Sequence, residues 1–541
     1  MTRRLAVWLL AHAALAVVTL LVFLPQHGRG LMLYDLGEVA FFVQKLQQGA
    51  APGLDFVVNG YGPGRYMLFA WLTAAVELPD LSVYAGVFIA LRALISALTL
   101  EVGLRLLPGR RRPWILLPLV LLLVAPGPLH KGFYLAGSLA LTLALLGYLD
   151  RPSRARALAY GLVLPAVAMF RLDLGLFGAV AFAFAVLGDR TRLPHLLLGA
   201  LPILVGVGLA LISLDGQGHG AVSAVLAQVW DDAAKNQTIS YPTFPSPLEL
   251  VLTPSLDRAL LWLPVLVYGA LLLALLRSAR WGFHVDPQDR RRLAVVLLLG
   301  VLTCNQVRMK PEFGHLLQAG PLLWIALALL LSRAAQGWPP RLAGGSDLPA
   351  PRAAGPGGMA LAIGLALAVV ALVVTNIGVH HRGSIYTGSW TIPEARTFIL
   401  DTPLGRAWLN EGEFREMAPL LEYLRTEVPP GPLWVPTNQP LLYGLTERAD
   451  VTGHVGVVYY ANDPGRERLV MDRLERGRPP VAIFVDDSIE GPERRLENAA
   501  PRVHSYLLTA YGEVQQFGRF HVMLRSPPVR TEGLPWPAQA P

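Results

Sequence analysis

The sequence predicts a polytopic α-helical membrane protein with a small α/β domain at its C-terminal end. Hydrophobic residues make up 53% of the 541-residue chain and charged residues only 16%, and the mean hydropathy is +0.45. Soluble domains carry about a quarter charged residues. The charge is missing from long blocks before about Asn376 and returns after them. Two composition regimes in one chain indicate two solvents, lipid first and water second.

Long apolar runs predict about eleven transmembrane helices, because roughly 20 apolar residues cross a bilayer and fewer suffice where neighbours bury the ends. The first run, Leu5–Leu24, is long and no small-residue cleavage site follows it, which favours an uncleaved span over a signal peptide. The expected spans lie near residues 5–25, 81–107, 114–126, 131–149, 157–170, 174–188, 193–213, 258–277, 293–306, 316–332 and 358–378.

Arginine clusters between the spans predict the orientation, since short cytoplasmic loops are rich in Lys and Arg. With a cytoplasmic N-terminus, the loops holding Arg110–Arg112, Arg151–Arg156, Arg190–Arg192, Arg277–Arg292 and Arg333–Arg352 all fall on the cytoplasmic side. The same clusters explain the pI of about 9.6, so no nucleic-acid partner is expected. A cytoplasmic (inner) membrane location follows, with the C-terminal domain outside the cytoplasm.

The expected organisation is a transmembrane domain over residues 1–378 and a soluble extracytoplasmic domain over 379–541. The first part includes outer loops at 26–80 and 214–257 and a Pro-, Gly- and Ala-rich cytoplasmic linker at 333–357. The apolar run 66–78 is too short to span and predicts a helix along the membrane interface. In the soluble domain, the pattern predicts helices over Glu413–Val428 and Arg466–Arg476, and strands over Pro432–Pro436, Val481–Val485 and Gly518–Arg525.

Ionisable residues gather in the outer loops, where simple connectors need none. The first outer loop holds Asp35, Glu38 and Asp55; the turn 126–131 holds His130 and Lys131; the turn 170–174 holds Arg171 and Asp173; and the turn 307–315 holds Arg308, Lys310, Glu312 and His315. Charged groups at a membrane boundary are costly unless paired or solvated, so they mark a candidate site.

Each feature also has a structural explanation. Asp35 and Glu38, three residues apart on a helix, would share a face and suit a helix start. Arg171 and Asp173 would form a structural ion pair, and His130 with Lys131 would sit at the interface as ordinary residues. The glycines around Tyr61 indicate a turn rather than a phosphate loop. The combination favours group transfer, because a carboxylate base and cations that hold a leaving phosphate serve one reaction.

The chain resembles the GT-C class of membrane glycosyltransferases, which includes dolichyl-phosphate-mannose mannosyltransferases and lipid A aminoarabinose transferases. The resemblance rests on Tyr34-Asp35-Leu36-Gly37-Glu38 after the first span and on the passage Gly49–Tyr66, which contains GLDFVVNGYGPGRY. It also rests on Phe170-Arg171-Leu172-Asp173 and on Arg308–His315, where Lys310 stands at a position that is often Asp in the family. Pieces of the C-terminal domain, such as VAIFVDD, are similar to the tails of bacterial members.

The resemblance implies an inverting glycosyl transfer from a polyprenyl-phosphate-linked sugar donor to a lipid, glycan or protein acceptor among the membrane lipids. Asp35 would be the catalytic base, with Glu38 supporting it or holding a metal. The donor phosphate would be bound by Arg171, Arg308, Lys310 and His315, and the substrates contacted by Asp55, Tyr61, His130, Lys131, Asp173 and Glu312. A divalent metal is a possible cofactor, with Asp35, Glu38, Glu312 and His315 as candidate ligands.

Two other classes remain open from the sequence. A transporter or flippase of lipid-linked sugars would place its site near the bilayer midplane on broken or repeated helices, and the sequence shows no internal repeat. A non-catalytic anchor for the C-terminal domain would leave the charged outer turns without a role.

Overall fold

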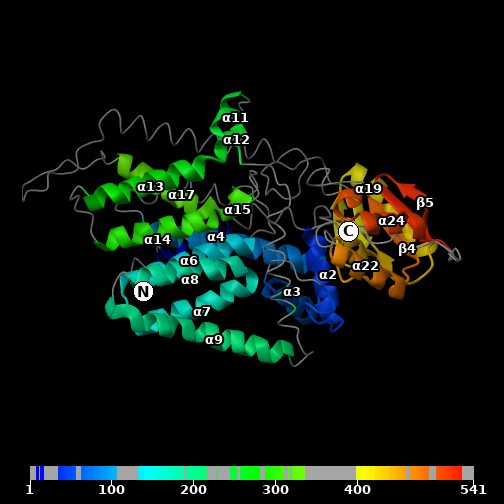
Figure 1. Cartoon of the computed structure of the whole chain (residues 1–541), viewed down its shortest axis with the longest axis horizontal. Helices are drawn as coiled ribbons and strands as arrows, with labels where there is room; N and C mark the ends of the chain where they lie inside the picture. Colours follow the sequence, from blue (N-terminus) through cyan, green and yellow to red (C-terminus); the bar gives the residue numbers. More distant parts are fainter. Residues whose placement is uncertain are drawn as a thin grey trace, which may run out of the picture.

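The structure is a computed structural model, and its helical part and C-terminal domain lie side by side with the first outer loop between them (Figure 1). It describes residues 6, 8–10, 12–17, 35–56, 62–106, 132–187, 190–215, 224, 227, 244–252, 256–280, 287–309, 315–316, 320–335, 398–457, 464–485 and 495–526.

The apolar runs form helices, most of them close to the predicted bounds. The long helices are α4 Asp80–Leu106, α6 Gly132–Asp150, α7 Arg154–Phe170, α8 Leu172–Leu187, α9 Leu193–Asp215, α13 Leu263–Arg280, α14 Pro287–Thr303 and α17 Gly320–Ala335. Shorter ones are η3 Arg190–Arg192, α11 Pro247–Leu252, α12 Leu256–Leu260 and α15 Asn305–Met309. The predicted spans 114–126 and 358–378 lie outside the described residues.

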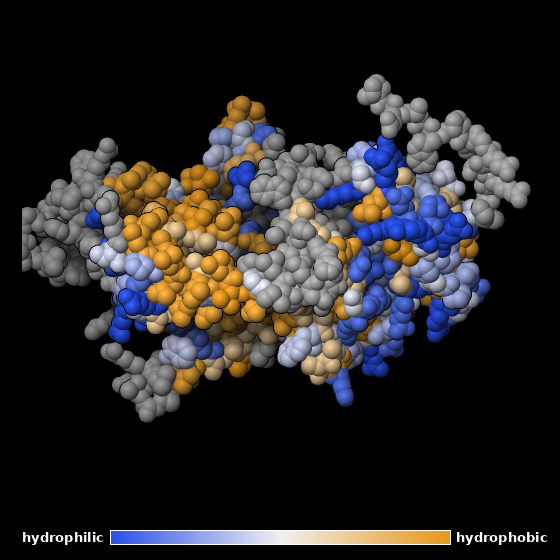
Figure 2. All heavy atoms as spheres, turned by 60° about the horizontal axis from the view of Figure 1, so that its bottom comes forward, coloured by the Kyte–Doolittle hydropathy of each residue, from blue (hydrophilic) through white to orange (hydrophobic). Residues whose placement is uncertain are grey.

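Three helices in the described part are long and apolar enough to cross a membrane: Asp80–Leu106, Gly132–Asp150 and Arg258–Leu276. Shorter apolar helices cover Trp8–Val17, Leu172–Leu187, Leu193–Gly206 and Gly320–Leu330. Several leucines on α9 and α13 are exposed, with Leu197 at 76% and Leu266 at 65%. On the face seen in Figure 2, hydrophobic residues predominate over the helical part, and hydrophilic residues predominate at the end that carries the C-terminal domain. These surfaces fit a membrane protein, while the count of about eleven spans stays a prediction.

Basic residues from several helices meet at one end of the helical part. The Arg292 guanidinium at the start of α14 donates its Nε hydrogen to Asp150 Oδ1 over 3.0 Å, at the end of α6. Arg105, in the last turn of α4, lies 3.7 Å from the same carboxylate. The Arg156 guanidinium, at the start of α7, donates to the Gly147 carbonyl. Arginines from two of the predicted cytoplasmic loops therefore share one end, although the side of the membrane stays a prediction.

The C-terminal domain is built around a four-stranded sheet of order β3-β4-β6-β5. Strand β4 (Val481–Val485) pairs in parallel with β3 (Leu433–Trp434) and antiparallel with β6 (Phe520–Arg525), which pairs antiparallel with β5 (Tyr511–Phe517). A hairpin of β1 (Phe398–Thr402) and β2 (Gly405–Leu409) precedes it. The helices are α19 Glu411–Thr426, α20 Leu441–Thr446, α22 Pro464–Gly477, α23 Leu496–Ala499 and α24 Pro501–Ala510.

The five elements predicted for this domain are present. Helix α19 starts where expected because Asn410 and Glu413 form a capping box, in which each side chain accepts from the other residue's backbone N–H. The sequence did not predict the β1–β2 hairpin, strand β5 or helices α20 and α24.

Part of the first outer loop lies within the core of the C-terminal domain. Helix α2 (Asp35–Gln47) contributes Val39, Phe41 and Phe42 to one buried cluster, which also contains residues of α19, α20 and β4. The Phe41 and Tyr443 rings lie 5.6 Å apart. The division at residue 378 stays a prediction, but segments on both sides of it share one hydrophobic core.

The run expected at 66–78 forms helix α3 (Gly64–Ala75). Its Tyr66 and Phe69 side chains are buried in the same cluster, while Trp71 is 66% exposed. One side of α3 thus packs in the cluster that contains α2 residues, and the helix leads to the start of α4. Its position relative to a bilayer stays a prediction.

Candidate functional site

The predicted acidic pair lies at the N-terminal end of α2. Asp35 is the first residue of this helix, and the structure describes its backbone position alone. Glu38 is buried, and its Oε1 accepts a 2.5 Å hydrogen bond from the Tyr66 hydroxyl of α3. The Tyr66 ring lies 4.1 Å from that of Phe42, one turn further along α2. The positive end of the helix dipole favours carboxylates here, and Tyr66 holds the Glu38 carboxylate in one orientation.

Asp55, the third predicted acid of the first outer loop, stabilises the turn in which it lies. The Asp55 carboxylate is exposed, and its Oδ2 accepts from the Ala51 backbone N–H over 2.7 Å. Gly53 within this turn has a φ of +84°, a conformation that glycine adopts readily. A substrate contact by Asp55 stays a prediction. Tyr61 lies outside the described residues.

Arg171 and Asp173 form a tight ion pair at the junction of α7 and α8. Arg171 Nε and Nη2 donate to the two carboxylate oxygens of Asp173 over 3.0 and 2.6 Å. Asp173 Oδ1 also accepts from the backbone N–H of Leu174, which fixes it to the first turn of α8. The Arg171 guanidinium lies over the Tyr134 ring, 4.6 Å from its centroid. The ion pair expected from the sequence is therefore present, and it holds a buried cation in one orientation.

Tyr134 connects this cation to the late loop. Its hydroxyl donates to the carbonyl of Thr303, the last residue of α14, over 2.9 Å. Arg308 follows on α15, where it is exposed and its Nε donates to Asn305 Oδ1 over 3.0 Å. His315 is half-buried. Lys310 and Glu312 lie outside the described residues, as do His130 and Lys131.

The first outer loop also reaches the end of α7. Gly62 donates its backbone N–H to the Phe170 carbonyl over 3.2 Å. A Cβ at Gly62 would lie 2.1 Å from the Met169 carbonyl oxygen, so the contact requires glycine. The Phe170 ring stacks on that of Phe133 at 4.9 Å. These contacts join the acidic helix α2, through α3 and Gly62, to the residue next to Arg171.

The contacts place this site and the arginine cluster at opposite ends of the helical part. Helix α6 begins at Gly132, beside Phe133 and Tyr134, and ends at Asp150, which binds Arg292. A helix of 19 residues is about 28 Å long. Phe133 and Tyr134, which contact Phe170 and Thr303, therefore lie at the opposite end of α6 from the Arg292 contact. The membrane topology itself stays a prediction.

Arg65 is a candidate that the sequence reasoning passed over. Its side chain is 2% exposed, and its guanidinium carbon lies 5.4 Å from the ring centroid of Tyr66, the partner of Glu38. The available signal was a single cation in the GPGR turn just before an apolar run. A buried arginine beside an acidic helix start is a further candidate for contact with an anionic substrate.

The metal prediction is not resolved by this geometry. Among the described residues, no three His, Cys, Asp or Glu side chains cluster as a metal site would require. Of the four candidate ligands, the structure describes the side chains of Glu38 and His315. Glu38 already accepts a hydrogen bond from Tyr66, and it fits a metal site only in combination with other ligands.

A separate groove of about 1220 Å³ lies on the C-terminal domain between β1, α19 and α20. Arg448 forms part of its wall and donates to the carbonyls of Leu424 and Val428 over 2.7 and 3.1 Å. The groove contains none of the predicted site residues.

No protein-family model and no curated protein sequence matches the chain. Solved structures do match. The oligosaccharyltransferase of Archaeoglobus fulgidus tethered with an acceptor peptide is 12% identical, with a TM-score of 0.51 over 96% of this chain and 75% of that one. The AglB oligosaccharyltransferase of the same organism, in complex with an inhibitory peptide and a dolichol-phosphate, is 12% identical. Its TM-score is 0.50 over 96% of this chain and 75% of that one. ArnT from Cupriavidus metallidurans bound to undecaprenyl phosphate is 11% identical, with a TM-score of 0.49 over 95% of this chain and 97% of that one.

These structural neighbours are GT-C glycosyltransferases, so the resemblance seen in the sequence is confirmed at the level of the fold. At such low identity the similarity describes the fold, and the chemistry has to be argued from the residues of the site.

Proposed function

We propose that this protein is a membrane glycosyltransferase that moves a sugar from a polyprenyl-phosphate carrier to an acceptor hydroxyl at the outer face of the cytoplasmic membrane. The observation that carries the proposal is the path of contacts from Glu38 through Tyr66 and Gly62 to Phe170, the neighbour of Arg171. It joins an acidic helix start to a buried cation at one end of the helical part. The GT-C-like fold, and the dolichol-phosphate bound to one AglB structure, support a lipid-linked donor.

The proposed reaction is a single displacement. Asp35 takes the proton of the acceptor hydroxyl, whose oxygen forms the new bond to the anomeric carbon. The bond from that carbon to the phosphate oxygen breaks, and the phosphate leaves with the electron pair. Attack from the face opposite the leaving group inverts the anomeric centre, by the logic of inverting glycosidases. Glu38 supports Asp35 and is one of the candidate metal ligands.

The cations stabilise the leaving phosphate. Arg171 is oriented by Asp173 and Tyr134, so little reorganisation is needed when charge develops on the phosphate. Arg308, Lys310 and His315 are proposed to share this role. Because these residues follow helices of the membrane domain, the carrier's phosphate would reach them while its lipid tail remained in the bilayer.

The decisive experiment replaces Asp35 by Asn in the full-length protein. Transfer from a radiolabelled polyprenyl-phosphate sugar should fall by at least about 10²-fold, since the base is lost while the shape is kept. Glu422→Gln is the matched control, because Glu422 is an exposed carboxylate on α19 that pairs with Arg425. Full activity of the Asp35→Asn protein would end the assignment of the base.

Cysteine accessibility separates this proposal from transport. Cysteines placed one at a time at Asp35, Arg171 and His315 should react with an impermeant reagent from the outer side only, with or without substrate. Reaction from both sides would favour alternating access and a transporter of lipid-linked sugars.

A further inference from the structure

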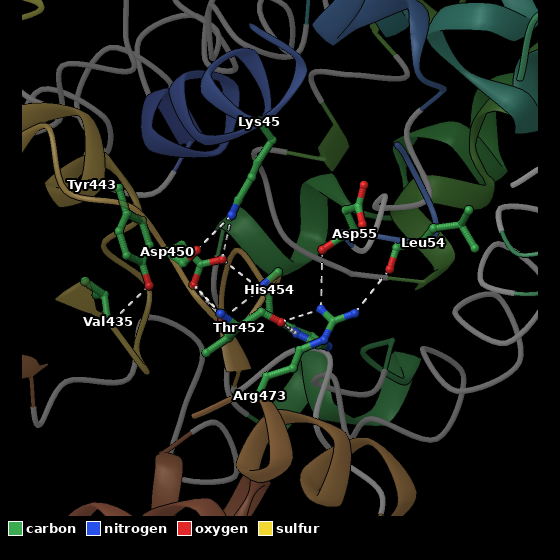
Figure 3. Close-up of polar contacts among 10 residues, drawn as sticks. Lys45, Leu54, Asp55, Val435, Tyr443, Asp450, Thr452, His454 and Arg473 are labelled. Atoms are coloured by element: carbon green, nitrogen blue, oxygen red, sulfur yellow. Dashed lines mark hydrogen bonds and ion pairs between the residues drawn. The ribbon is translucent and has the colours of Figure 1, made fainter. Parts of the chain in front are cut away.

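A buried ion pair fastens the acidic helix α2 to the C-terminal domain (Figure 3). Lys45 Nζ, in the last turn of α2, lies 3.3 Å from Asp450 Oδ2 and donates to the Asp450 carbonyl oxygen over 2.9 Å. The Asp450 side chain has no solvent exposure, and that of Lys45 is 13% exposed. The two residues are 405 positions apart in the sequence.

Donors other than Lys45 also hold the Asp450 carboxylate in place. Its Oδ1 accepts from the backbone N–H and the hydroxyl of Thr452 over 2.9 and 2.7 Å. Its Oδ2 accepts from the Gly453 N–H over 2.6 Å. A buried carboxylate costs little when such donors satisfy it, so Asp450 is a fixed anchor for the lysine.

A second cation joins the same turn to the first outer loop. Arg473 of α22 donates from Nη1 to the Thr452 carbonyl over 2.6 Å and from Nη2 to the Leu54 carbonyl over 3.2 Å. A Cβ on Gly453 would lie 2.2 Å from Arg473 Nη1 and 2.4 Å from the Asp55 carbonyl oxygen. The turn at residues 450–454 is therefore packed between α22 and the loop that follows α2.

The geometry of α2 links this anchor to the acids. Lys45 follows Glu38 by seven residues, which is two helical turns, so both lie on one face of the helix. Apolar contacts such as Phe41 with Tyr443 already hold the helix against the domain. Apolar contacts alone tolerate small rotations and slips, whereas a buried charge pair has one good arrangement and can specify register.

We propose that the C-terminal domain is a positioning part of the transferase site, in which Asp450, through Lys45, sets the rotation and axial register of α2 and thereby places Asp35 and Glu38. Lys45 and Asp450 are positioning residues, since neither is proposed to touch substrate. The inference rests on the proposed function for its kinetic consequence, but the anchoring of α2 has a readout of its own.

The test is Lys45→Met in the full-length protein, with Lys45→Arg as the conservative variant. The kcat for sugar transfer should fall about 10- to 100-fold, because a misplacement of about 1 Å has that effect on catalysis. The donor KM should change by less than about 3-fold, because the phosphate-binding residues are untouched. Lys45→Arg should retain most of the activity. Arg415→Gln is the matched control, since it breaks an exposed pair with Glu411 on the same domain.

Hydrogen exchange supplies the second measurement. Amides of α2 should exchange about 10-fold faster in Lys45→Met, while those of β4 and β6 keep their protection. Wild-type kcat with unchanged α2 exchange would overturn the proposal. Equal loss of protection in α2, β4 and β6 would also overturn it, by showing a general structural role. If the wild-type protein transfers no sugar from polyprenyl-phosphate donors, the proposed function fails, and the exchange data still report whether Lys45 anchors α2.

Discussion

The Tyr66 hydroxyl donates a 2.5 Å hydrogen bond to Glu38 Oε1, and both side chains are only 2% exposed. A phenol from α3 thus orients a carboxylate of α2 beside a buried cluster of hydrophobic side chains. A buried carboxylate has to be satisfied locally, because its desolvation is expensive. Glu38 therefore occupies a prepared position one turn from Asp35, which suits a supporting role for the predicted base.

Replacing Tyr66 by Phe should test this arrangement. The Glu38 oxygen would lose a buried donor, so we expect a stability loss of about 1–3 kcal/mol and transfer slowed roughly 10-fold. Thermal unfolding and a transfer assay would measure both. Tyr84→Phe is the control, because Tyr84 is a buried tyrosine of the same cluster with only a 3.4 Å bond to Asp80. Equal effects in the two variants would remove the special role of Tyr66.

The close approach of Gly62 to α7 makes a second prediction. In Gly62→Ala, the new methyl group would meet the Met169 carbonyl at 2.1 Å, so the loop must move away from Arg171. Transfer should fall by at least about 10-fold, since positioning errors of this size are costly. In Gly86→Ala the methyl group meets nothing within 4 Å, and α4 should gain about 0.5–1 kcal/mol in helix propensity. Activity retained in Gly62→Ala would contradict a tight junction here.

Removing the partner of Arg171 should weaken the site. Asp173→Asn leaves a largely buried guanidinium beside a neutral amide. We expect a loss of about 1–3 kcal/mol in stability, because the pair is partly shielded from solvent. The donor KM should rise, since the cation loses its fixed orientation. Asp401→Asn removes the exposed partner of Arg406 and should change stability by less than about 0.5 kcal/mol. Identical melting temperatures for both variants would show that the Arg171 pair is not structural.

The C-terminal domain should lose stability in mild acid. Burial, followed by the positive charges of Arg473 and Arg466, lowers the pKa of His454 from 6.5 to about 4. Between these values the unfolded chain binds a proton that the folded domain does not. The stabilisation is therefore fully present above pH 6.5 and is lost as the pH falls toward 4. The slope is about 1.4 kcal/mol per pH unit, and the total is on the order of 3 kcal/mol.

Melting of the full-length protein, followed through the domain's tryptophans, would measure this slope between pH 7 and 4.5. His454→Gln should flatten it, whereas His504→Gln should leave it in place. A slope that survives in His454→Gln would assign the acid sensitivity to other groups. His454 Nδ1 donates to the Thr452 carbonyl over 2.8 Å in both protonation states, so the cost of acid lies in burying the positive charge of the ring.

The sequence predicted those features that depend on local pattern. Long apolar runs gave the helices, and the buried run at Val481–Val485 gave the central strand β4. Strand β5 was missed because its middle residues, GEVQQ, are exposed and mostly polar, so no alternation marks it. The β1–β2 hairpin was missed because the turn between its strands is a Pro-Leu pair, which carries none of the usual hairpin signals.

In the candidate site too, some contacts were predictable from the sequence and others were not. The spacing of Arg171 and Asp173 was visible in the sequence, and the structure confirms their contact. The bond between Tyr66 and Glu38 was not visible, since a tyrosine at the start of an apolar run is expected to pack as core. The pairing of Lys45 with Asp450 depends on three-dimensional contacts across 405 residues, which no local pattern records.

The shared core also determines the order in which the protein can be completed. A ribosome makes α2 near the beginning of the chain, yet Tyr443, Asp450 and β4 are made near the end. During synthesis α2 therefore exists for a time without the C-terminal residues that hold it in register. A chain that stops before residue 398 retains the acids but none of these partners, so an unfinished protein lacks an assembled site. Under the proposed function, the site is therefore complete only after the last domain has been made and has packed against α2.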